Sequence, residues 1–241
     1  MPVKRTDGRR TNETRPISFE ANYFRDHVTL VSYGETRVLC YASIDERVPG
    51  WLLGSGHGWI TAEYSMLPTA SYPRQNRERN VASGRTSEIQ RLIGRALRAS
   101  SHLNLLPPLT IKIDCDVIIA DGGTRTAAIT GAFVSLASLV YAERHRFAKS
   151  PLKAQVAAVS VGLRSGETLL DLDYQEDSSC EVDGNVVKTR ANELVDLSFT
   201  AEHRCFSHED LSALLKLADK GLESIFAEQA KHLPQRLEYS P

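Results

Sequence analysis

The chain lacks the features that mark several common classes of protein. Its 241 residues include only four cysteines, and none of them forms a CxxC pair, so a structural zinc site is not expected. Cys40 and Cys115 lie in apolar, strand-like runs, which predicts buried free thiols of the kind found in a reducing compartment. The formal net charge is only −1. A nucleic acid or a membrane surface would therefore have to be bound through a local patch of charge.

Long apolar segments are also missing. The first twenty residues are charged and have no apolar core, so no secretory signal peptide is expected. The longest nearly apolar run, GAFVSLASLVYA over residues 131–142, is shorter than the roughly 20 residues that cross a bilayer. The sequence also contains no low-complexity segment and no internal repeat. These features predict a cytoplasmic protein with no membrane partner.

The spacing of apolar residues predicts a mixed α/β (α+β) fold. In the first half, Ser87 and Gln90 form the capping-box pattern of a helix start. The polar N-terminal segment 3–16, VKRTDGRRTNETRP, is expected to be loose or to dock late. The expected elements are two strands around Gly34 within 27–45, strands at 59–67 and 109–120, and helices from about Ser87 and Thr124.

After Pro151 the pattern changes to four expected strands and one long amphipathic helix. A second capping-box pattern, Ser207 with Asp210, marks the start of that helix. The two halves of the chain, residues 1–150 and 151–241, are expected to pack together as one unit.

The helix expected from Thr124 has an unusual beginning, ADGGTRTAAITGA. Unpaired N–H groups and the helix dipole attract anions to a helix N-terminus, and glycine lets a ligand approach the backbone closely. Thr124 adds a hydroxyl group, and Arg125 adds a forked, permanently charged donor. A phosphate site at Gly123, Thr124 and Arg125 is one interpretation. A tight strand-to-helix turn with a surface arginine is the other, and these residues alone leave both open.

Basic residues are concentrated between positions 74 and 98, where seven arginines are accompanied by two acidic residues. Arg85 lies just before the expected helix start, which is a second place that favours an anion. Arg74 and Arg77 lie in a polar loop beside Tyr72, an arrangement suited to the phosphates and bases of single-stranded RNA. A solvated loop is the alternative. The arginines of the helix share one face, which favours a solvated or subunit-contact surface: Arg91, Arg95 and Arg98.

Six carboxylates crowd the segment DLDYQEDSSCEVDG, residues 171–184. Neighbouring carboxylates repel one another unless they hold a cation or fold apart. Magnesium takes one or two carboxylates together with water and phosphate oxygens. If Glu176–Asp177 ends one strand and Asp183 lies on the next, these acids could converge on such an ion. A polar hairpin with Asp183–Gly184 as its turn is the alternative.

Four segments resemble the ribonuclease PH family of phosphate-dependent 3′-to-5′ exoribonucleases, and the resemblance extends from about Asp7 to Gly221. It implies a fold of two βαβ-like halves, related to the second domain of ribosomal protein S5, and a homo-hexameric ring. It also implies that the substrates are tRNA precursors and other RNA with single-stranded 3′ ends. The segments are SGRTSEIQRLIGRALRAS, IDCDVIIADGGTRTAAITGA, GSGHGWITAEYSMLP and LLDLDYQEDSSCEVDGNVV.

The resemblance implies roles for particular residues as well. Asp177 and Asp183 are expected to support Mg²⁺ and the chemistry, and one of them, Asp183 by preference, could instead protonate the leaving 3′ oxygen. Arg74 and Arg77 are expected to bind RNA. Inorganic phosphate, the co-substrate, is expected at Arg85, Gly123, Thr124 and Arg125.

The activity that the resemblance implies is the reversible removal of 3′-terminal nucleotides as nucleoside diphosphates, with phosphate as the nucleophile. No Ser–His–Asp set or activated cysteine in the sequence competes for that role. A non-catalytic RNA-binding ring subunit of an exosome-like assembly is the alternative. A hydrolytic nuclease, which would release monophosphates, is a third possibility.

Two short departures from the family pattern lie in or after the acidic segment. Family members often carry a larger apolar residue where this chain has Gly184. They often read Val-Glu-Val-Gln-Gly-Thr-Ala-Glu-Gly where this chain has VDLSFTAEH, residues 195–203. Gly184 follows Asp183 and is expected to loosen the placement of that carboxylate. The second departure is expected to change the local packing of a strand.

Replacing both Arg74 and Arg77 with alanine should weaken RNA binding and flatten its salt dependence. Each lost contact to a phosphate of a single strand lowers the slope of log K against log salt by about 0.7. Binding titrations of a single-stranded RNA at several salt concentrations measure this slope. An unchanged slope would count against an RNA-binding loop.

Overall fold

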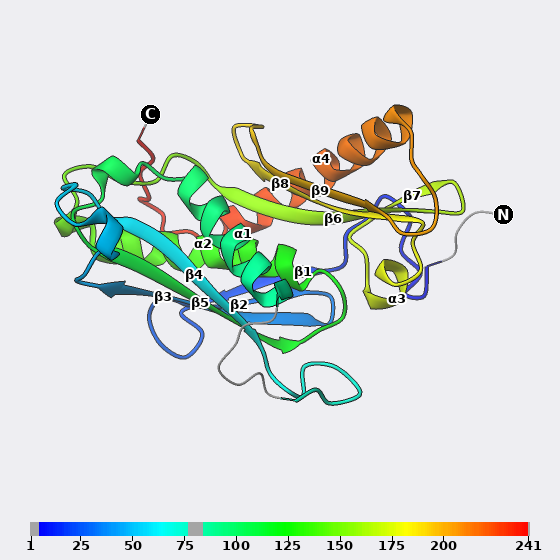
Figure 1. Cartoon of the computed structure of the whole chain (residues 1–241), viewed down its shortest axis with the longest axis horizontal. Coiled ribbons are helices and arrows are strands. Elements are labelled where there is room, and N and C mark those ends of the chain that lie inside the picture. The colour runs from blue at the N-terminus through cyan, green and yellow to red at the C-terminus, as the bar shows by residue number, and fades with distance from the viewer. Residues whose placement is uncertain (1–4, 77–83, 241) are drawn as a thin grey trace.

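The computed structural model describes residues 5–76 and 84–240, which form two β-sheets with helices between and beside them (Figure 1). The first sheet has the strand order β1-β2-β3-β5-β4, and the second has the order β7-β6-β8-β9. Within these residues β4 and β5 pair in parallel, and every other strand pair is antiparallel. The prediction of a mixed α/β fold is confirmed.

Strands and helices are interspersed along the chain. The first sheet and its helices are β1 (Ile17–Ala21), β2 (Val28–Tyr33), β3 (Thr36–Asp45), β4 (Trp59–Met66), α1 (Gly84–Ala99), β5 (Thr110–Ile119) and α2 (Thr124–Ala142). The second sheet and its helices are β6 (Val156–Arg164), β7 (Glu167–Leu170), α3 (Tyr174–Asp177), β8 (Val182–Thr189), β9 (Leu194–Ala201) and α4 (His208–Ala230). Short 3-10 turns lie at Gly50–Leu52, Leu103–Leu105 and Arg144–Arg146.

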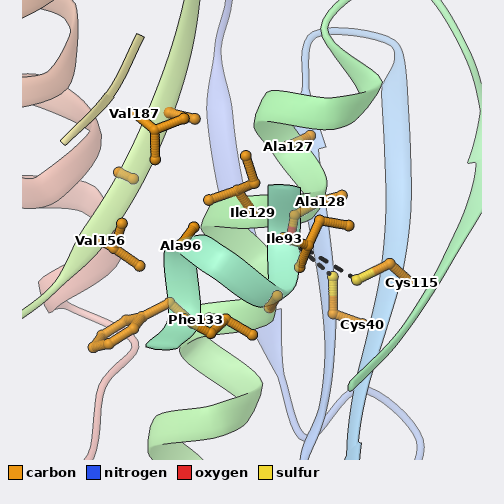
Figure 2. Packing of buried hydrophobic residues seen from close by; sticks show 14 of the residues in the cluster. Cys40, Ile93, Ala96, Cys115, Ala127, Ala128, Ile129, Phe133, Val156 and Val187 are labelled. Carbon is orange, nitrogen blue, oxygen red and sulfur yellow. Dashed lines mark hydrogen bonds between the residues drawn. The ribbon is translucent and has the colours of Figure 1, made fainter. Parts of the chain in front are cut away.

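Helix α2 lies between the two sheets and forms the centre of the hydrophobic core (Figure 2). Val156 and Val187 approach it from the second sheet, and Cys40 and Cys115 lie opposite one another in the first sheet. Both thiols donate hydrogen bonds to the carbonyl oxygen of Ala128, at 3.7 and 4.0 Å. The two cysteines are buried and free, as the sequence predicts.

Within the residues described, α2 is also the helix that is long and apolar enough to cross a membrane, judged by length and composition. The helix has 19 residues, so it extends beyond the nearly apolar run at 131–142. However, 78% of this stretch is buried inside the protein. The apolar surface of α2 is therefore used in the core, where it contacts β3 and β6.

Helix α4 packs against β6 and β7 and reaches β1 of the first sheet. The side chain of Ser207 accepts a hydrogen bond from the backbone N–H of Asp210, and the Asp210 carboxylate accepts one from the N–H of Ser207. This is the capping box that the sequence predicts. Buried Leu214, Leu222 and Ile225 form the inner face of the helix.

Two local expectations are wrong. Helix α1 begins at Gly84, not at Ser87, because its first turn precedes the apolar residues from which the sequence pattern was read. Asp183 and Gly184 do not form a turn. They lie inside β8, opposite Gly162 and Val161 of β6, so the hairpin interpretation of the acidic segment is also wrong.

The N-terminal segment is docked rather than loose, because two of its arginines are buried in ion pairs. Arg5 donates two hydrogen bonds to the carboxylate of Glu176, at 2.7 and 2.6 Å. Arg15 donates to both carboxylate oxygens of Asp171, at 3.0 and 2.7 Å, and to the carbonyl oxygen of Asp121. All four ion-pair side chains are at most 3% exposed. The segment therefore joins the turn before α2 to the segment that contains α3.

Replacing Arg5 with methionine should lower the free energy of unfolding by about 3 kcal/mol, because buried Glu176 would lose both short hydrogen bonds from Arg5 and keep only the more distant Arg9, whose Nη2 lies 3.7 Å from Oε2. Urea unfolding of the two proteins measures the difference. Arg10→Met is the matched control, because Arg10 forms an exposed ion pair with Glu13 and exposed pairs contribute little. Equal losses in the two variants would contradict the anchoring role of the buried pair.

Candidate active site

A cavity of about 1110 Å³ opens where β4 and β5 end and α1 and α2 begin. The segment 71–76 and the segment around α3 and β8 complete its walls. The described residues that the sequence singled out all line it: Arg74, Arg85, Gly123, Thr124, Arg125, Asp177 and Asp183. Arg77 lies outside the described residues. Side chains from both halves of the chain therefore share one cavity.

The turn between β5 and α2 is built from two glycines in the left-handed conformation, Gly122 (φ 72°) and Gly123 (φ 67°). A Cβ atom on Gly122 would lie 2.5 Å from the carbonyl carbon of Asp173. Glycine is thus required at position 122 by its left-handed conformation and by the neighbouring backbone. Gly123 is the N-cap residue of α2 and has no side chain to accept hydrogen bonds from the first turn. Those N–H groups are available to an anion in the cavity.

Tyr64, at the end of β4, orients the hydroxyl group of Thr124. Its phenolic oxygen donates a hydrogen bond to Thr124 Oγ1 at 2.9 Å. Burial raises the pKa of Tyr64 above its ordinary value, so this phenol remains a neutral donor at physiological pH. Thr124 can then donate its own proton to a ligand in the cavity.

Arg85 and Arg125 occupy equivalent places, each in the first turn of a helix that points toward the cavity. Arg125 Nη1 lies 3.5 Å from Glu88 Oε1, and this carboxylate is 62% exposed. An exposed ion pair of this kind is weak. The two guanidinium groups and two helix N-termini therefore place positive charge together at the cavity, where an anion would be favoured.

The acidic segment folds so that its carboxylates separate. Asp171 pairs with Arg15, and Glu176 pairs with Arg5. Asp173 caps α3 by accepting a hydrogen bond from the N–H of Glu176 at 2.8 Å. The remaining carboxylates include two that line the cavity, and these are the two that the sequence selected: Asp177 and Asp183.

Negative charge in the cavity is only partly compensated. Burial raises the pKa of Asp177, although Arg125 and Arg85 oppose this change. Burial also raises the pKa of Asp183, and repulsion from Asp177 and Glu202 adds to it. Uncompensated carboxylates of this kind are typical of functional sites.

A divalent cation would relieve this repulsion. Asp177 and Asp183 supply only carboxylate oxygens, which are the ligands that magnesium prefers. In the part of the chain that the structure describes, no group of three or more His, Cys, Asp or Glu residues is arranged to hold a metal. Two carboxylates nevertheless fit an ion that keeps several waters and binds substrate phosphates.

The 71–76 segment forms one wall of the cavity. Arg74 lines it, and the Tyr72 side chain is fully exposed. A basic side chain beside an exposed aromatic ring can bind the phosphates and bases of a single strand. This placement agrees with the expectation for Arg74.

Comparisons with known proteins agree with this geometry. Residues 13–140 match domain 1 of the 3′ exoribonuclease family, and residues 154–221 match domain 2. The chain belongs to the 3′ exoribonuclease family. A curated member, ribonuclease PH of Crocosphaera subtropica (strain ATCC 51142 / BH68), is 48% identical over 239 residues, which cover 98% of this chain and all of the relative.

Solved structures in the same comparisons share the fold. Rice (Oryza sativa) Rrp46 aligns with a TM-score of 0.76 at 20% identity. The alignment covers 95% of this chain and 100% of the Rrp46 chain. A chain of the Archaeoglobus fulgidus exosome with RNA bound to the active site aligns with a TM-score of 0.76 at 18% identity. The alignment covers 95% of this chain and 92% of that chain.

Three cavity residues of this 3′ exoribonuclease family member were not identified from the sequence. Tyr64 lies in a segment that predicts a strand, and its hydroxyl group gives no sequence signal of its own. Glu202 and His203 follow β9 in the chain and line the cavity beside Asp183. Only the pairing of β9 with β8 brings them there.

Asp183→Asn should raise the melting temperature at pH 7.5 by about 1–3 °C, because it removes a charge that is disfavoured first by burial and then by repulsion from Asp177 and Glu202. Solvent at the cavity keeps the gain small. A raised pKa means that the wild-type protein loses stability as pH rises through that pKa. The gain should therefore shrink as pH falls toward 3.8, the ordinary pKa of aspartate. Thermal unfolding across this pH range measures it.

Asp210→Asn provides a control of opposite sign. The hydrogen bond from the backbone of Ser207 lowers the pKa of Asp210, so this carboxylate stabilises the protein above 3.8 and the variant should lose stability there. A gain for Asp183→Asn that does not vary with pH would contradict the raised pKa of Asp183.

Proposed function

We propose that the protein is a phosphate-dependent 3′-to-5′ exoribonuclease that shortens tRNA precursors and other RNA with single-stranded 3′ ends. The observation that carries this proposal is the shared cavity. Anion donors at the starts of α1 and α2 lie in it together with two carboxylates from α3 and β8. The relative that is 48% identical over nearly the whole chain is named ribonuclease PH.

Inorganic phosphate is the nucleophile. Arg85, Arg125, the Thr124 hydroxyl group and the N–H groups after Gly123 bind it, and Tyr64 orients Thr124. The Thr124 hydroxyl group and the backbone N–H groups of α2 are held in place before phosphate arrives, so their reorganisation opposes binding little. A phosphate bound there by several donors presents one remaining oxygen for attack on the last phosphodiester of the RNA.

The reaction is an in-line displacement at phosphorus. A bond forms between the attacking phosphate oxygen and the last phosphodiester phosphorus, and the bond from that phosphorus to the 3′ oxygen breaks. The terminal nucleotide leaves as a nucleoside diphosphate, and the RNA keeps a 3′ hydroxyl group. A raised pKa suits Asp183 to donate a proton to the leaving 3′ oxygen. Because no water is consumed, the reaction is reversible.

Asp177 would hold Mg²⁺, and Asp183 would join it as a ligand when it is ionised and not acting as the proton donor. When bound, this ion neutralises charge on phosphoryl oxygens. The fit rests on two carboxylates that line one cavity and repel one another. Arg74 and, by expectation, Arg77 bind the RNA strand that leads into the cavity.

The proposal extends to assembly and location. A homo-hexameric ring, built as a trimer of dimers, is consistent with the large apolar side chains that the single chain exposes, such as Phe24 (65%), Trp51 (67%) and Leu53 (73%). Exposed apolar surface of this kind is usual at protein interfaces. A cytoplasmic location gives the enzyme access to tRNA precursors and to inorganic phosphate.

The deciding experiment incubates the pure protein with Mg²⁺ and a tRNA that carries a short 3′ extension, with and without phosphate, and identifies the released nucleotide. Nucleoside diphosphates that appear only with phosphate are the expected result. Monophosphates released without phosphate would instead indicate a hydrolase. No release despite RNA binding would favour a non-catalytic ring subunit.

In the same assay, Arg125→Ala should raise the phosphate concentration needed for half-maximal rate by about 10- to 100-fold, because charge-assisted hydrogen bonds are lost. Arg91→Ala is the matched control. Arg91 is an exposed arginine of α1 that does not line the cavity, so its variant should keep the wild-type phosphate dependence. An unchanged dependence in Arg125→Ala would contradict the proposed phosphate site.

A further inference from the structure

One row of residues crosses the second sheet directly beside the acidic pair. Leu170 of β7, Val161 of β6, Gly184 of β8 and Phe199 of β9 are successive cross-strand partners. Cross-strand partners share a face of the sheet. Leu170 packs against Gly221 of α4, where an added Cβ atom would lie 2.7 Å from Leu170 Cδ1. The row therefore lies on the α4 side of the sheet.

Asp183 lies on the opposite face. It precedes Gly184, and successive residues of a strand point to opposite faces. Its own partners are Gly162 of β6 and Thr200 of β9. The row on the α4 side therefore packs behind β8, on the face opposite the one from which Asp183 lines the cavity.

Gly184 has no room for a side chain because Phe199 occupies the space. A Cβ atom built on Gly184 would contact two ring atoms of Phe199 at less than 2.5 Å. A glycine in a strand normally weakens it, but an aromatic ring from the neighbouring strand can fill the gap. Gly184 is buried, and Phe199 packs against the main core. The expected loosening of Asp183 is therefore offset by the packed ring.

Phe199 also anchors the segment that follows β9. Its ring lies 6.2 Å from the ring of Phe206 in a tilted arrangement, within the range of favourable aromatic pairs. The segment between these two rings contains Glu202 and His203, which line the cavity. The backbone N–H of Glu202 donates to the carbonyl oxygen of Glu181 at 3.0 Å. The segment is thereby tied to Phe199 through Phe206 and to the acidic segment through Glu202.

We infer that Phe199 is a positioning residue of the active site, which acts by filling the gap above Gly184 and so fixes Asp183 and Glu202 in the cavity. The two departures from the family pattern lie opposite one another in this ladder. This inference rests on the proposed function, because it assigns Asp183 to the chemistry.

A double-mutant cycle tests the inference. Phe199→Gly should lower kcat by about 10-fold or more, because the strand beneath Asp183 loses its support, and Gly184→Leu should do the same by colliding with the ring. The phosphate KM should stay within about 2-fold, because the phosphate donors lie on α1 and α2. The double variant, in which leucine fills the gap left by phenylalanine, should recover kcat to within about 3-fold of wild type.

Leu197→Gly is the matched control. Leu197 lies two residues away on the same strand, opposite Val186, and does not cover Gly184. Its variant should keep kcat within about 2-fold of wild type. Phe199→Ala replaces Phe199→Gly where thermal unfolding shows that the latter does not fold, with the same expected results.

Two outcomes would overturn the inference while leaving the proposed function intact. They are a wild-type kcat in the Phe199 variant, and a double variant whose loss equals the product of the two single losses. A wild-type protein that shows no phosphorolysis would overturn the proposed function, and this inference with it.

Discussion

Arg15 is placed where the two halves of the active site meet, and its guanidinium group is shared between them. It binds the carboxylate of Asp171, which follows β7, and the carbonyl oxygen of Asp121, which precedes the glycine turn. Arg5 makes the corresponding bond to Glu176 in α3. Arg9 lies 3.7 Å from a carboxylate oxygen of each acid, so three arginines together compensate the two buried charges, which would be very costly if unpaired. These pairs hold the anion-binding turn and the acidic helix at a set separation.

This arrangement lets the cavity itself keep unbalanced charge. Arginines and helix N-termini gather on one side, and Asp177, Asp183 and Glu202 on the other. Phosphates would compensate the positive side of the cavity, and a divalent cation the negative side. In the protein alone, the raised pKa values of Asp177 and Asp183 mean that their ionised forms lower the stability of the fold. The buried ion pairs, the α2 core and the Phe199–Gly184 contact supply the rigidity that keeps these groups in place.

Local sequence patterns predict part of this site and leave the rest undetermined. The start of α2 was predictable because two glycines interrupt the apolar pattern just before Thr124. The sequence did not predict which of the six carboxylates form ion pairs and which line the cavity, because their partners are far away in the chain. Arg15 lies 156 residues from Asp171, and Arg5 lies 171 residues from Glu176. The same distance explains why the N-terminal segment looked free in the sequence. Arg5 and Arg15 are buried in this segment only because the second half supplies their counter-charges.

By itself, the sequence determined the α/β class, the buried helix α2, the capped helix α4 and the residue types of an anion site, because periodicity and capping are local. Only the tertiary structure decided which carboxylates reach the cavity. It also brought Tyr64 to Thr124 and placed Phe199 over Gly184. Each of these contacts depends on the register and packing of strands that are distant in the chain, and no local pattern encodes that register.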